Sequence, residues 1–137
     1  MTLETLFQLA AIAHLGLVAA GLTMPSATNL WEHIRTLPDF TRHLFKTYYV
    51  FIGFILVSFG TLTFVYAGEL TSGTPLAKAM CLIMTLFWLI RLAVAAWVFD
   101  VTPYLETPLL RLGYTLTNIV FGLLPFIYAI GLFIPAP

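Results

Sequence analysis

The sequence predicts an all-α integral membrane protein, a bundle of four membrane-spanning helices. Of its 137 residues, 61% are hydrophobic and only 9% are charged, whereas a soluble domain needs far more charge to cover its surface. Four apolar segments each approach the roughly 20 residues that a helix needs to cross a bilayer. Spanning backbone must satisfy its own hydrogen bonds, so these segments are expected to be helices of one bundle.

The four predicted spans lie at approximately residues 3–22, 45–66, 76–99 and 109–133. We expect them to form a single transmembrane domain that covers residues 1–137. The first span is predicted to be a retained helix and not a signal peptide, because the leading stretch "MTLETLF" carries Glu4 and no cation, and because the apolar run is too long.

The loop after the first span contains an amphipathic stretch, "NLWEHIRTLPDF". Four apolar residues share one face of a short helix predicted at about residues 30–37: Leu30, Trp31, Ile34 and Leu37. Asn29 and Glu32 have the spacing of a capping box, and Pro38 would end the helix. We predict that this helix lies in the membrane interface on the cytoplasmic side.

The cations predict the orientation of the chain. Arg35, Arg42 and Lys46 border the first connection and Arg111 borders the third, whereas the other side has only Lys78. By the positive-inside rule, the first and third connections face the cytoplasm. Both the N- and C-termini are therefore expected outside.

A weak internal repeat favours two similar helical hairpins. "HLGLVAAG" begins at His14 and "RLAVAAWV" begins at Arg91, and Pro25 and Pro103 follow eleven and twelve residues later. A duplicated hairpin would produce this pattern. Chance resemblance between apolar helices would also produce it, and both explanations stay open.

Each predicted span carries one polar residue well inside its boundary: His14, Tyr49, Arg91 and Asn118. Counted from the predicted cytoplasmic ends of the spans, all four lie about 10–12 Å deep at 1.5 Å per residue. We therefore expect the four side chains to point into one interior ligand-binding site. No metal site, cofactor or catalytic residue is predicted, because the sequence has no recognised signature of any of them.

Arg91 has two competing interpretations. A cation at this depth costs about 2.5–3.5 kcal/mol on insertion scales, and no carboxylate lies at equal depth in the sequence. In one interpretation, Arg91 holds an anionic headgroup, a carboxylate or a quinone oxygen. In the other, it extends along the helix to the interface, and the other three side chains make interhelical hydrogen bonds. Proton relay by His14 is a third interpretation, because imidazole titrates near neutrality.

The stretches "GTPLAKAMCLIMTLFWLIRL", "LLRLGY" and "LPDFTRHLF" resemble a set of uncharacterised small four-span bacterial inner-membrane proteins. The most specific elements of this resemblance are Cys81, Trp88, Arg91 and Arg111. The resemblance implies a multi-pass protein of the bacterial inner (cytoplasmic) membrane. It implies no activity, substrate or cofactor.

The favoured function is that of an accessory or structural membrane protein whose polar site binds a lipid or another anionic amphiphile. The alternatives are a small enzyme or redox carrier acting on a quinone-like or lipid-like substrate, and an oligomeric transporter. The expected partners are the lipid bilayer, further copies of the chain or a larger membrane complex, and a lipid or quinone-like ligand. Nucleic acid is not expected, because the net charge is zero and no basic block occurs.

Overall fold

The computed structural model describes residues 2–135, which form helices joined by short loops. Four long helices dominate the chain: α1 (Leu3–Ala27), α3 (Asp39–Val65), α5 (Pro75–Trp97) and α6 (Pro108–Leu132). The shorter elements are α2 (Leu30–Arg35), α4 (Ala67–Leu70) and the 3-10 turn η1 (Thr102–Tyr104). The predicted all-α four-helix bundle, with a short helix in the first loop, is confirmed.

All four long helices are long and apolar enough to cross a membrane. Their outward faces carry large apolar side chains in numbers that a soluble protein does not expose. Examples from the four helices are Leu22, Phe54, Ile90 and Phe126, which are between 65% and 70% exposed. A lipid bilayer is the environment that suits these faces.

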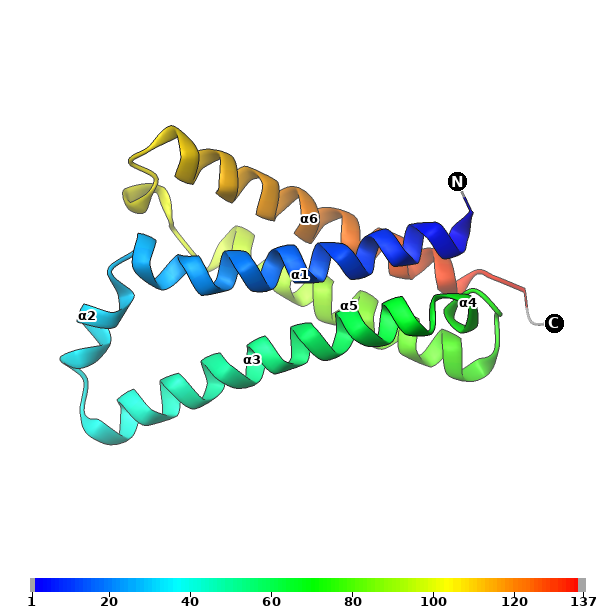
Figure 1. The fold of residues 1–137 in the computed structure, drawn as a ribbon, viewed down its shortest axis with the longest axis horizontal. Coiled ribbons are helices and arrows are strands. Elements are labelled where there is room, and N and C mark those ends of the chain that lie inside the picture. The colour runs from blue at the N-terminus through cyan, green and yellow to red at the C-terminus, as the bar shows by residue number, and fades with distance from the viewer. Residues whose placement is uncertain (1, 136–137) are drawn as a thin grey trace.

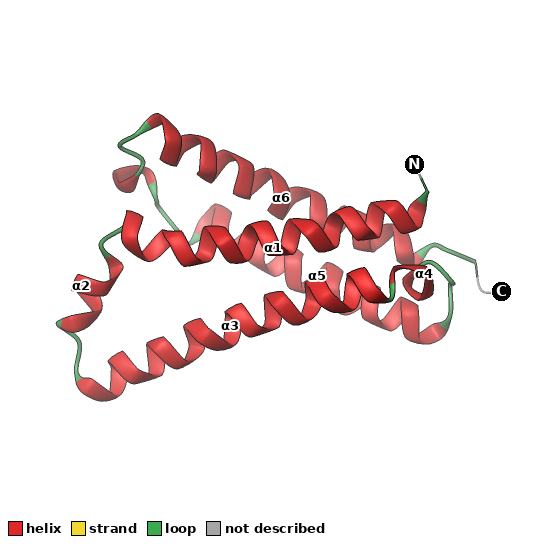
Figure 2. Cartoon of the chain, viewed as in Figure 1, coloured by secondary structure: helices red, strands yellow, loops and turns green. Residues whose placement is uncertain are grey.

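The helices are arranged as two hairpins. α1 packs mainly against α3, α5 packs mainly against α6, and the two hairpins meet chiefly where α1 contacts α6. Both termini and α4 lie at one end of the bundle, and α2 and η1 lie at the other (Figure 1). α3 and α6 spread apart toward the α2 end (Figure 2).

Three of the long helices begin with a threonine cap. The side chains of Thr2, Thr74 and Thr107 each accept a hydrogen bond from the backbone N–H three residues later. Pro75 and Pro108 follow two of these caps at the first helical position, where proline has no hydrogen bond to lose. The local sequence therefore sets where these helices start.

The start of α2 differs from the predicted capping box. Asn29 adopts the left-handed conformation, with φ of 51°, and its side chain makes no capping bond. Its carbonyl instead accepts hydrogen bonds from the backbone N–H groups of Glu32 and His33, at 3.1 and 3.4 Å. The chain must turn sharply between α1 and α2, and asparagine tolerates the left-handed conformation that this turn uses.

Two helices extend further at the α2 end than the sequence predicts. α1 continues to Ala27 and includes Pro25, and α3 begins at Asp39 and not near residue 45. Hydropathy marks where a helix leaves hydrocarbon, and the polar residues beyond that point still favour helix. This extension changes the depth of every residue counted from a helix end.

Two glycines allow close approach in the buried centre. A Cβ on Gly60 of α3 would lie 3.0 Å from the Cβ of His14 and 3.3 Å from the carbonyl oxygen of Ala11, both on α1. A Cβ on Gly131 of α6 would run into Cys81 of α5. Small residues at such positions let membrane helices pack through direct backbone contact.

Gly60→Val should destabilise the fold by about 1–3 kcal/mol, the usual cost of overpacking a close contact. Gly53→Val is the matched control on the same helix, because a Cβ there meets nothing within 4 Å. Unfolding of the purified variants in mixed micelles by increasing SDS would measure the free energy of unfolding of each variant. Equal stability of the two variants would contradict the close α1–α3 contact.

Candidate functional site

His14 lies at the centre of the bundle and is completely buried. Its ring meets Trp88 of α5 edge-on, with centroids 5.1 Å apart, and Tyr128 of α6 at 6.1 Å, while Gly60 of α3 faces its Cβ. Its Nδ1 lies 2.7 Å from the carbonyl oxygen of Ala10. A carbonyl only accepts, so Nδ1 carries the hydrogen, and in the neutral ring Nε2 is an acceptor.

A hydroxyl pair joins the two hairpins beside His14. The hydroxyls of Thr63 on α3 and Tyr128 on α6 lie 2.7 Å apart, and both residues are fully buried. Phe7 of α1 packs edge-on against Tyr128, at a centroid distance of 5.7 Å. On this side of the buried centre, the side chains pack against one another and the two hydroxyls pair with each other.

Trp88 lies next to His14, on the side of the buried centre that faces the α2 end. Its side chain is 1% exposed and is enclosed by His14, by Phe87 at 5.1 Å and by Phe121 of α6 at 5.8 Å. Its indole N–H is buried and has no hydrogen-bond partner. An indole N–H only donates, so the group lacks an acceptor.

Arg91 follows Trp88 by three residues on α5. Its guanidinium carbon lies 4.8 Å from the centroid of the Phe121 ring and 5.7 Å from that of Phe99. Phe99 lies beyond the last residue of α5, Trp97, so the side chain is directed toward the α2 end. Arg91 is partly buried, and its Nη1 is buried without a partner.

In the described part of the chain, no carboxylate pairs with Arg91. Asp100, the acid closest to it in sequence, is exposed and accepts a hydrogen bond from the backbone N–H of Thr102 at 3.0 Å. Hydrogen bonds from the side chain and the backbone of Thr102 hold the pKa of Asp100 below its usual value. Within residues 2–135, the only ion pair joins Arg42 to Asp39.

His14, Trp88 and Arg91 form what we call the polar row. In the described part of the chain, the buried side-chain nitrogen and oxygen atoms without a partner are His14 Nε2, Trp88 Nε1 and Arg91 Nη1. Trp88 contacts His14, and Phe121 contacts both Trp88 and Arg91. Buried polar groups are rarely left unpaired, because each costs free energy. Three such groups, linked through the His14–Trp88 contact and the shared Phe121 ring, therefore mark a place where a ligand would be stabilised.

The structure does not bring all four predicted site residues together. His14 and Arg91 belong to the polar row. Tyr49 instead donates a hydrogen bond to the carbonyl of Gly21, seven residues or about 10 Å along α1 from His14. Asn118 is partly buried on α6, three residues before Phe121. Tyr49 is therefore not level with His14, because the packing of α3 on α1 places Gly60, and not Tyr49, beside His14.

Trp88 is the member of the polar row that the sequence did not predict as a site residue. The available signal was its position three residues before Arg91, which places the two side chains on the same face of α5. A tryptophan contributes a large apolar ring to any hydropathy count, and the single N–H that needs a partner leaves no trace in such a count.

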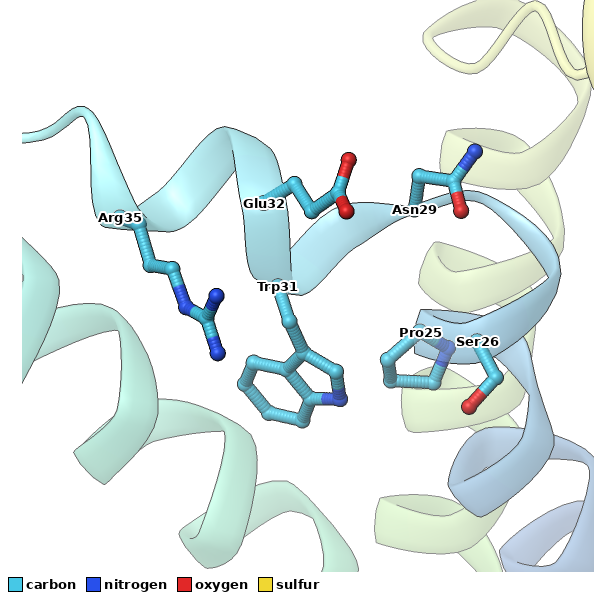
Figure 3. A pocket seen from close by; sticks show the side chains of 6 residues that line it. All are labelled: Pro25, Ser26, Asn29, Trp31, Glu32 and Arg35. Carbon is cyan, nitrogen blue, oxygen red and sulfur yellow. The ribbon is translucent and has the colours of Figure 1, made fainter.

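A separate pocket lies where α1 turns into α2 (Figure 3). Six residues line it: Pro25, Ser26, Asn29, Trp31, Glu32 and Arg35. Trp31 and Arg35 point from α2 toward α3, whereas Glu32 points to the opposite side of α2 (Figure 3). Trp31 also packs edge-on against Tyr49, with centroids 5.9 Å apart. The pocket shares no residue with the polar row, and its indole and guanidinium suit a membrane interface.

The chain matches no family model, and comparison with curated proteins and with solved structures also found no match. Within residues 2–135, no three His, Cys, Asp or Glu side chains gather where they would hold a metal ion. The polar row is therefore the feature from which a function must be inferred.

The hydroxyl pair between the hairpins should contribute measurable coupling energy. We expect a double-mutant cycle of Thr63→Val and Tyr128→Phe to give about 0.6 kcal/mol, the average for interhelical hydrogen bonds in membranes. The control cycle pairs Tyr128→Phe with Thr117→Val, because the Thr117 hydroxyl bonds within its own helix to Gly113. SDS unfolding measures both cycles, and equal coupling in the two would contradict the Thr63–Tyr128 contact.

Proposed function

We propose that this protein is a small accessory or structural membrane protein that binds an anionic amphiphile of the bilayer at the polar row. Arg91 is the proposed anchor for the anionic group. The observation that carries the proposal is a partly buried guanidinium with a buried, unpaired Nη1 and no carboxylate beside it. Four helices of this protein are long and apolar enough to cross a bilayer, which is where such an amphiphile is found.

The energetics of Arg91 favour a ligand with a phosphate. An arginine inside a span costs free energy unless a counter-charge or water reaches it. A phosphate supplies both the negative charge and oxygens that match the fork of the guanidinium. The ring of Phe121 covers the guanidinium at 4.8 Å, an arrangement that also stabilises the cation. The remaining N–H groups are then available to donate to the phosphate.

The depth of Arg91 also suits a lipid. Six residues, or about 9 Å, separate it from Trp97 at the end of α5. Its contact with Phe99, which follows the end of α5, supports a side chain that extends from there toward the membrane surface. The two interpretations of Arg91 thus become one: an arginine that extends toward the interface meets the phosphate layer of the bilayer.

We propose that the α2 end of the bundle faces the cytoplasm of a bacterium. Four cations border the connections at this end: Arg35, Arg42, Lys46 and Arg111. The opposite end has Lys78 alone, beside both termini. This imbalance supports the orientation through the positive-inside rule. The lipid at Arg91 would then come from the cytoplasmic leaflet.

Arg91→Leu should weaken binding of phosphatidylglycerol about tenfold or more, because a hydrogen bond to a charged group contributes about 1.5–3 kcal/mol. Binding of diacylglycerol with the same acyl chains should be unchanged, since it lacks the phosphate. Native mass spectrometry of the purified protein titrated with each lipid measures both affinities.

Lys78→Leu is the control for this experiment, because it removes the same charge from the opposite end of the same helix. It should leave phosphatidylglycerol binding at Arg91 intact. Equal affinity of the wild type for phosphatidylglycerol and diacylglycerol would refute the proposal. So would equal losses in the two variants.

The proposed orientation predicts the labelling of two exposed positions at opposite ends. A cysteine in Glu69→Cys should react with an impermeant maleimide in intact cells whose outer membrane has been permeabilised. A cysteine in Glu32→Cys should react only after the inner membrane is opened. Cys81 is fully buried and gives a silent background. The reverse pattern would show the opposite orientation.

A further inference from the structure

We infer that the amphiphile held at Arg91 is an ester-linked glycerophospholipid, and that the indole N–H of Trp88 donates a hydrogen bond to its ester carbonyl. This inference rests on the proposed function, because it assumes that a phosphate lies at Arg91. It adds a second recognition element deeper in the membrane. That element selects the linkage between the glycerol and its acyl chains.

The two donors are arranged one behind the other. Trp88 and Arg91 are three residues apart on α5, which places them on one helical face with a rise of about 4.5 Å. The Trp88 ring and the Arg91 guanidinium both pack on the ring of Phe121, at 5.8 and 4.8 Å, so the two side chains lie against the same residue of α6. Arg91 is nearer the end of the helix, and Trp88 is nearer the bundle centre.

A glycerophospholipid presents its acceptors in the same order. Its phosphate lies outermost, and the ester carbonyls lie deeper, separated from the phosphate by the glycerol carbons. A carbonyl is the acceptor that the buried indole N–H lacks. An ether-linked lipid keeps the phosphate, the glycerol and the chains, and has no carbonyl. The polar row thus offers one donor group for the phosphate and one for an ester carbonyl.

His14 makes a buried water the main competitor of the lipid. With Nδ1 donating to Ala10, Nε2 needs a donor, which an ester carbonyl cannot supply. The carbonyl is therefore assigned to Trp88 alone. A water that accepts from Trp88 and donates to His14 is the competing occupant, because it would satisfy both rings. Such a water would make the site indifferent to the lipid linkage.

The packing of the helices leaves this side of the interface lightly held. The two hairpins contact each other chiefly through α1 and α6, and the contacts of α5 are mainly with α6. Because Trp88 is only 1% exposed, a carbonyl that reaches its N–H must displace side chains that enclose it. The exposed part of Arg91 marks the side from which the lipid headgroup approaches.

The test compares diester and diether phosphatidylglycerol with matched chain lengths by native mass spectrometry. The wild type should bind the diester about threefold to tenfold more tightly, as expected for one buried neutral hydrogen bond. Trp88→Phe should remove this preference by weakening diester binding alone. Trp97→Phe is the control, because Trp97 is an 85% exposed tryptophan on the same helix.

The outcomes separate this inference from the proposed function. Equal binding of diester and diether lipid by the wild type overturns the ester inference and favours the buried water. The proposed function survives that result if Arg91→Leu still loses phosphatidylglycerol binding. A preference for the diester that persists in Trp88→Phe also overturns the role assigned to Trp88.

A second measurement covers the case in which Trp88→Phe does not fold. In the double variant Trp31→Phe/Trp97→Phe, Trp88 is the only tryptophan of the chain. Its indole N–H proton resonance should move downfield when diester lipid is added, and should stay in place with diether lipid. The same position in both lipids would overturn the inference without any change at Trp88.

Discussion

The requirement that polar groups inside a bilayer find partners within the protein or the lipid governs this structure. Most of the buried polar side chains meet it locally. Thr85 donates to the carbonyl of Cys81 one turn earlier, and Thr63 pairs with Tyr128 across the hairpins. The polar row is the exception, with three unpaired atoms on side chains that are in contact or share the Phe121 ring. These three atoms are therefore the interior positions at which a partner from outside the chain would be stabilising.

The architecture explains why the unpaired groups gather where they do. Gly60 brings α3 against His14, so the ring is fixed where the two hairpins meet. The Phe7, Tyr128 and Thr63 contacts close the centre on one side. On the other side, α3 and α6 spread apart toward α2 (Figure 1). The polar row runs from this centre toward the α2 end, and Arg91 is its outermost member.

The sequence predicted the helices well because the physics of a span is visible in hydropathy. A run of about 20 apolar residues has few structural alternatives in a membrane. Hydropathy does not locate helix ends, so α1 and α3 are longer than predicted. Asn29 was expected to cap α2 through its side chain, whereas the turn after α1 requires a left-handed residue. That requirement is set by the three-dimensional path of the chain.

The sequence predicted only part of the candidate site, for a related reason. An arginine or histidine in an apolar run is conspicuous, so Arg91 and His14 were found. Tyr49 looked equivalent in depth, yet it bonds to Gly21 nearer the α2 end, and this could be known only once the α1–α3 register was known. Trp88 was not predicted as a site residue, because hydropathy reflects its apolar ring and not its N–H group. The unsatisfied indole becomes apparent only when every neighbour is in place.

The abundance of the proposed ligand favours an accessory or structural role over turnover. A bilayer lipid is present far above any realistic dissociation constant, so the site would be occupied nearly always. A ligand that binds only the folded state stabilises it by RT ln(1 + [L]/Kd), about 2.7 kcal/mol at a hundredfold excess. The lipid would then act as a missing part of the bundle that supplies the acceptors which Arg91 and Trp88 lack. The fold would then depend on the surrounding membrane, because the lipid would offset the free-energy cost of placing Arg91 inside the span.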